Sequence, residues 1–234
     1  MPDVVQVGPF LLKMQWLVGI GSLLVGYLVI RYRLKVAGPN AAGYRDERVI
    51  QTIENSALLA LVVWKFSVAI FDPASIWANP MALLYYTGGA QGVWLAAVAA
   101  LIYFYLRARR ERVSVWVYGE LVAVGLLAAT AIYHLISLFW YHQGVQSDVL
   151  QIVTALTILL LAFFRSGKEV GDALNLDQAV LWFSLAQVGI AFLDPRRPRY
   201  WRGFSREQVL YIGLSALTLG IEWAAERRRL GRNV

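Results

Sequence analysis

Five ionisable residues lie inside long apolar stretches of this sequence, and they are the first places to look for chemistry. They are Lys13, Glu54, Lys65, His134 and Glu222. A charged side chain is costly within a hydrocarbon layer, so such residues are functional candidates by default. Lys65 would offer a cation to a phosphate, and His134 would offer an imidazole that exchanges a proton near neutral pH.

Lys65 and His134 each have a second, purely structural interpretation. Lys65 would bind an anionic headgroup in a cavity, pair with Glu54 or a backbone carbonyl, or snorkel to the outer surface. His134 would act as a general base or as a hydrogen-bonded packing residue. His134 and His142 share a helix face, but no carboxylate or cysteine joins them at metal-ligand spacing. We therefore expect no metal ion and no cofactor.

The elements that must position these residues are membrane-spanning helices. Hydrophobic residues make up 59% of the 234-residue chain and charged residues 16%, whereas soluble domains carry about a quarter charged residues. The charges come in short runs, separated by apolar stretches of about 20 residues, which is the length of helix that crosses a hydrocarbon core. Continuous apolar runs exclude a barrel. The sequence therefore predicts an all-α, polytopic helical bundle.

We expect one transmembrane domain over residues 1–234, containing seven spans. Their predicted ranges are 9–30, 50–71, 81–106, 114–140, 148–164, 177–193 and 207–225. The segment before the first span carries no basic residue, unlike the n-region of a cleaved signal peptide. Glycines at 88, 89 and 92 interrupt the third span, either to allow close helix packing or to break the helix beside a cavity.

Basic residues predict the orientation of the spans. They follow spans one, three, five and seven, whereas the loops after spans two and four hold no lysine or arginine. The positive-inside rule then places the N-terminus outside and the C-terminus in the cytoplasm. The net charge of +7 is accordingly attributed to topology and anionic lipid, and not to nucleic acid. The absence of cysteine excludes disulfides and thiolate metal sites.

One loop breaks the orientation pattern. Residues 195–206 are predicted to lie outside, yet they contain Arg196, Arg197, Arg199, Arg202 and Arg206. Either one span is miscounted, or the outer arginines bind the headgroup of a phospholipid, because guanidinium forks match phosphate.

Short motifs follow one another in a particular order along almost the whole chain. They are Val7-Gly8-Pro9-Phe10, Arg31-Tyr32-Arg33, Ile70-Phe71-Asp72-Pro73, Thr87-Gly88-Gly89, Leu106–Arg112 before Glu120, and Phe192-Leu193-Asp194-Pro195 before Gly203-Phe204-Ser205. This order resembles that of prolipoprotein diacylglyceryl transferases, bacterial enzymes that move a diacylglyceryl group from phosphatidylglycerol to a lipoprotein cysteine. The resemblance implies seven spans, an outer N-terminus, the bacterial inner membrane and phosphatidylglycerol as a partner.

The catalytic signature of that family is mostly missing. Its histidine after Gly-Gly is absent from Gly88-Gly89-Ala90-Gln91-Gly92, and its arginines of the second, fourth and sixth spans fall on Lys65, His134 and Gln187. We take His134 as the candidate catalytic residue. The candidate headgroup ligands are Lys65, Gln91, Gln187, Arg196, Arg197 and Arg199.

Three functions are open at this point. The first is a divergent relative of the transferase that binds phospholipid or serves as a membrane subunit, without turnover, beside a protein partner that the sequence does not name. The second is an active transferase with a site rebuilt around Lys65, His134 and the outer arginines. The third is a small transporter or channel of unrelated origin, which the scarcity of polar residues inside the spans disfavours.

Overall fold

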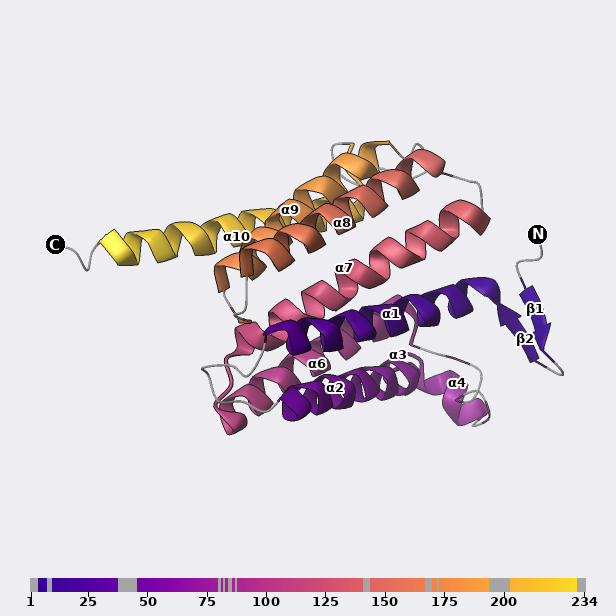
Figure 1. The fold of residues 1–234 in the computed structure, drawn as a ribbon. Helices are drawn as coiled ribbons and strands as arrows, with labels where there is room; N and C mark the ends of the chain where they lie inside the picture. Colours follow the sequence, from indigo (N-terminus) through magenta and orange to yellow (C-terminus); the bar gives the residue numbers. More distant parts are fainter. Residues whose placement is uncertain are drawn as a thin grey trace. The chain divides into compact units, whose positions relative to one another are not determined.

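The computed structural model describes residues 4–7, 10–37, 46–79, 81, 83, 86, 88–140, 144–166, 170–171, 173–193 and 203–230. Within this part of the chain there are seven long helices (Figure 1): α1 Met14–Ala37, α2 Asp46–Phe66, α6 Gly89–Glu111, α7 Val115–Trp140, α8 Val145–Ser166, α9 Ala173–Phe192 and α10 Arg206–Leu230. Short helices α3 Val68–Phe71 and α4 Pro73–Ala78 follow α2. A hairpin of β1 Val4–Val7 and β2 Phe10–Lys13 precedes α1.

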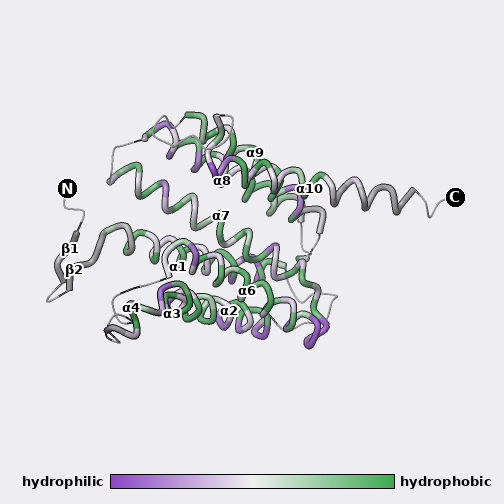
Figure 2. Tube along the Cα trace, turned by 180° about the vertical axis from the view of Figure 1, so that it is seen from behind, coloured by the Kyte–Doolittle hydropathy of each residue, from purple (hydrophilic) through white to green (hydrophobic). Residues whose placement is uncertain are grey.

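The predicted helical architecture is confirmed, and the seven long helices agree with the predicted number of spans. In the described part of the chain, five segments are long and apolar enough to cross a membrane: Leu17–Ala37, Glu47–Phe71, Gly89–Glu111, Val115–Trp140 and Val145–Phe164. A shorter apolar segment, Leu176–Phe192, lies in α9. Hydrophobic residues predominate along α6, α7 and α8 (Figure 2). The spans assigned to α9 and α10, and the orientation of the termini, stay predictions.

The first span is displaced from its predicted range of 9–30. Phe10–Lys13 pairs antiparallel with the valine-rich Val4–Val7, a composition that suits a strand. The helix instead begins at Met14 and continues to Ala37, because its buried stripe includes Arg33, Leu34 and Ala37 beyond the predicted end. Residues 31–35, predicted to lie in a loop, are therefore helical.

The chain forms two compact units. The first comprises residues 1–38 and 119–234, and the second comprises residues 39–118. The prediction of a single domain over 1–234 concerns how these units join, and it stays a prediction.

Small residues set the packing of the first unit. Its hydrophobic core brings α7, α8 and α9 together through Leu127, Ala131, Ala155 and Ile158, with Phe183 packed against them. α1 approaches α7 where two glycines face each other, and a Cβ on Gly26 would overlap the carbonyl oxygen of Gly125. Such close approaches of backbone are typical of helices that associate in membranes.

Glycines also set the packing of α2 against α6 in the second unit. Ser67, at the junction of α2 and α3, is buried against Gly88 and Gly92, and a Cβ on either glycine would overlap its hydroxyl. This contact agrees with the packing interpretation of the glycines. The helix of the third span begins only at Gly89, which has a φ of +55°, and not at residue 81 as predicted.

Candidate functional site

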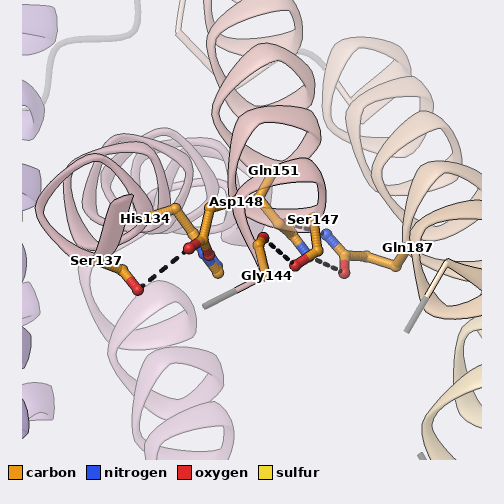
Figure 3. A network of polar contacts seen from close by, with 7 residues as sticks. All are labelled: His134, Ser137, Gly144, Ser147, Asp148, Gln151 and Gln187. Carbon is orange, nitrogen blue, oxygen red and sulfur yellow. Dashed lines mark hydrogen bonds and ion pairs between the residues drawn. The ribbon is translucent and has the colours of Figure 1, made fainter. Parts of the chain in front are cut away.

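A row of polar side chains crosses α7, α8 and α9 in the first unit (Figure 3). At one end, Nδ1 of His134 lies 2.7 Å from Oδ1 of Asp148. The hydroxyl of Ser137 donates to the other carboxylate oxygen, Oδ2, at 3.3 Å. Both oxygens of Asp148 therefore have a partner on α7.

Local sequence explains how Asp148 comes to face α7. His134 and Ser137 lie three residues apart, so both side chains are on one face of α7. Gly144 has a φ of +79°, a conformation that glycine adopts without strain, and its carbonyl accepts the Asp148 N–H at 3.0 Å. The carboxylate then lies in the first turn of α8, where the helix dipole favours negative charge.

One turn further along α8, two buried amides join α8 to α9. Nε2 of Gln151 donates to Oε1 of Gln187 at 2.8 Å, and Nε2 of Gln187 donates back to Oε1 of Gln151 at 2.6 Å (Figure 3). An amide buried in apolar surroundings without partners would cost free energy. The reciprocal pair avoids that cost and fixes the register of α8 against α9.

Gln208 continues the row onto α10. Its Nε2 donates to the carbonyl of Val188 on α9 at 3.2 Å. Its Oε1 accepts the N–H of Ser205 at 2.8 Å, while the Ser205 hydroxyl accepts the N–H of Gln208 at 3.2 Å. This reciprocal arrangement is a capping box, which the pattern Ser-x-x-Gln at the start of α10 makes possible.

The His134–Asp148 pair is the part of the row that is able to transfer protons. With Nδ1 held by the carboxylate, Nε2 of a neutral imidazole carries a lone pair that accepts a proton. The His134 side chain is 24% exposed and the Asp148 side chain is 10% exposed. Ser137 donates to Asp148 and not to the imidazole, so the three residues differ from a nucleophilic triad, in which the serine bonds to histidine.

A second polar group in the first unit is fully buried. Nη2 of Arg33 lies 3.2 Å from Oε1 of Glu120, and the two side chains are 1% and 3% exposed. Oε2 of Glu120 accepts the N–H of Gly171 at 2.7 Å, and the Arg33 guanidinium lies 5.5 Å from the centre of the Phe163 ring. The carboxylate has both oxygens occupied, which indicates a structural clasp between α1, α7 and the segment before α9.

The predicted site residues of the first unit have different outcomes. His134 and Gln187 both lie in the polar row, although they bond to different residues of α8. The predicted ligands Arg196, Arg197 and Arg199 lie outside the described residues.

The other two predicted ligands belong to the second unit. Nζ of Lys65 donates to the carbonyl of Tyr86 at 3.1 Å, one of the structural roles considered for it. Its neighbour Trp64 donates to the carbonyl of Gly89 at 3.3 Å, so both residues connect α2 to the beginning of α6. Gln91 is exposed in the first turn of α6.

Sequence reasoning missed the partners Asp148, Gln151 and Glu120. A signal for the first existed, because His134 and Asp148 lie equally far from Tyr141 in the sequence. Antiparallel helices joined by a short connection bring such positions together. The same signal exists for the second pair, because Gln151 and Gln187 lie equally far from Glu169 in the sequence, between α8 and α9.

The apolar helices and the interior polar row are those of a multi-pass helical membrane protein. Models of known protein families give no match to this chain, and curated proteins give no significant match either. The resemblance to prolipoprotein diacylglyceryl transferases therefore rests on the order of its motifs.

Proposed function

We propose that this chain is a multi-pass protein of the bacterial inner membrane that binds phospholipid, phosphatidylglycerol first, without diacylglyceryl transfer. The order of motifs supports a relationship with prolipoprotein diacylglyceryl transferases. One observation carries the absence of turnover. His134 and Gln187, which stand at the positions of family arginines, bond within the bundle to Asp148 and Gln151.

The chemistry of diacylglyceryl transfer explains why the engagement of these polar residues argues against turnover. A lipoprotein thiolate attacks a glycerol carbon of phosphatidylglycerol, the bond from that carbon to the phosphate oxygen breaks, and glycerol 1-phosphate leaves. Fixed cations must stabilise the leaving phosphate, and a base must take the thiol proton. Gln187, at the position of a family arginine, is an uncharged amide with a buried partner. It supplies no fixed positive charge for the leaving group.

A second candidate is an active transferase with a rebuilt site. The orientation of His134 favours it, because Asp148 holds Nδ1 and leaves Nε2 for the thiol proton. Lys65, Arg196, Arg197 and Arg199 would then supply the cations for the phosphate. We rank this candidate below the first because Lys65 already bonds to a backbone carbonyl.

One assay separates the two candidates. The purified protein in phosphatidylglycerol bilayers is given a lipobox peptide, and both glycerol 1-phosphate release and the peptide mass are measured. We expect no product, whereas a transferase with the full signature, tested in parallel, modifies the peptide. Product that is lost in His134→Ala but retained in Ser137→Ala would establish the rebuilt site. Lipid binding is measured separately by native mass spectrometry, and equal retention of phosphatidylglycerol and phosphatidylcholine would refute the binding proposal.

A further inference from the structure

A basic pocket lies in the second unit where the beginning of α2 meets the end of α6. It has a volume of about 460 Å³ and is lined by Arg48, Gln51, Arg107, Arg110, Glu111 and Arg112, a set that we call the arginine pocket. Its volume is in the range of small-molecule sites, about 300–1,000 Å³. Four guanidinium groups stand against one carboxylate, so the pocket is suited to an anion.

The single carboxylate of the arginine pocket is already engaged. Oε1 of Glu111 lies 3.2 Å from Nη1 of Arg107, and Oε2 accepts the Tyr118 hydroxyl at 3.3 Å. Among the described residues, no carboxylate pairs with Arg48, Arg110 or Arg112. Three guanidinium groups therefore remain available to a ligand.

The backbone at Arg112 is a second, independent observation. Arg112 ends α6 with a left-handed φ of 56°, and its N–H donates to the carbonyl of Ala108. Among the described residues it is the only one other than glycine with a positive φ. Glycine is the usual residue at this position of a helix end, because a side chain is strained there. Strained backbone is concentrated at functional sites, so an arginine retained at this strained position of the pocket lining is a candidate ligand-binding residue.

An exposed apolar stripe on α6 leads to the arginine pocket. Val98, Leu101, Ile102, Tyr105 and Leu106 are each at least 46% exposed. Their spacing of three and four residues places them on one helix face, and the same face continues to residues 109 and 110. An acyl chain along this stripe would bring its headgroup to the arginines.

We propose that the arginine pocket binds the phosphate of an anionic phospholipid headgroup. Arginine forks bind phosphate through paired charge-assisted hydrogen bonds, and Gln51 adds an amide to the lining of the same pocket. The positive-inside rule puts this pocket at the cytoplasmic surface. It is thus separate from the outer arginines considered above, and it stands whether or not the chain is related to the transferases. A soluble phosphate ester offers the same chemistry, but the apolar stripe favours the lipid.

The test titrates the full-length protein in detergent with phosphatidylglycerol and follows the bound lipid by native mass spectrometry. Arg48→Gln combined with Arg110→Gln should bind at least about tenfold more weakly, because hydrogen bonds to charged groups are lost. For a comparison matched in charge, Arg110→Gln alone is set against Arg109→Gln, which removes one charge from a residue that lies over the Tyr105 ring at 4.7 Å. An equal loss in Arg109→Gln would overturn the proposal, because charge alone would then explain binding.

Arg112→Gly separates binding from folding. Glycine relieves the left-handed backbone, so the thermal unfolding midpoint should stay the same or rise, while the lipid affinity falls severalfold. Unchanged affinity in this variant and in the double variant would refute the site. Glycerol 1-phosphate is the soluble competitor. Displacement of phosphatidylglycerol at equimolar concentration would overturn the assignment to a lipid, and resistance to it supports that assignment.

Discussion

Breaking the clasp between Arg33 and Glu120 is the most quantitative test of the first unit. The pair is 1% and 3% exposed, and its shortest nitrogen–oxygen distance is 3.2 Å. Removing one partner of such a buried pair leaves the other charge without compensation, which costs about 3–5 kcal/mol. Glu120→Gln and Arg33→Met should therefore each reduce the free energy of unfolding by about that amount.

The double variant, Arg33→Met with Glu120→Gln, tests the coupling between the two residues. With both charges of the pair gone, neither is left buried without its partner. The introduced amide still has an oxygen for the N–H of Gly171, which in the native protein lies 2.7 Å from Oε2 of Glu120. The combined loss should be at least about 3 kcal/mol smaller than the sum of the two single losses. The assay is reversible unfolding of the four proteins in mixed micelles. Additive losses, or single losses below about 1 kcal/mol, would refute the reasoning, because such small effects are typical of solvent-exposed ion pairs.

Three further expectations follow from the packing and the polar contacts. Gln151→Leu should lower the free energy of unfolding by about 1–3 kcal/mol because it leaves the Gln187 amide buried without its partner, and adding Gln187→Leu should restore most of that loss. Gly26→Ala should destabilise by about 1–3 kcal/mol, because its Cβ would overlap a carbonyl of α7, whereas Gly21→Ala, which meets nothing within 4 Å, should not destabilise. Lys65→Ala should reduce phosphatidylglycerol retention at the proposed outer site in native mass spectrometry; equal retention would remove this residue from that site.

The helices were predictable from apolar length, and their ends only in part. The fourth predicted span, 114–140, differs by one residue from α7 because polar residues flank a continuous apolar run. The sequence predicts too early a start for the third span, because residues 81–87 are largely apolar, whereas the helix begins at Gly89. The first was placed too early because hydropathy does not distinguish the strand Phe10–Lys13 from the first turn of a helix.

The polar residues of these contacts are predictable individually, and their pairing is predictable only in part. His134 and Gln187 are conspicuous because polar side chains are rare inside apolar helices. Equal spacing about a connection indicates candidate partners on consecutive helices. Whether two such side chains meet depends on how each helix is rotated, which one sequence does not specify. Arg33 shows the opposite error, since its charge predicted exposure in a loop while Glu120 allows it to be buried. In the sequence, the arginines of the pocket are evident only as a topology signal, because the proximity of Arg48 to the end of α6 arises from tertiary packing.

The central claim is a multi-pass membrane protein with an outer N-terminus, and cysteine labelling tests it most directly. The natural chain has no cysteine, so single substitutions give an unambiguous signal. In intact cells, a membrane-impermeant maleimide should label Gly203→Cys, and it should label Gly38→Cys only after the membrane is permeabilised. Labelling of Gly38→Cys from outside, with Gly203→Cys protected, would contradict the orientation, and labelling of both before permeabilisation would contradict the predicted number of crossings between them.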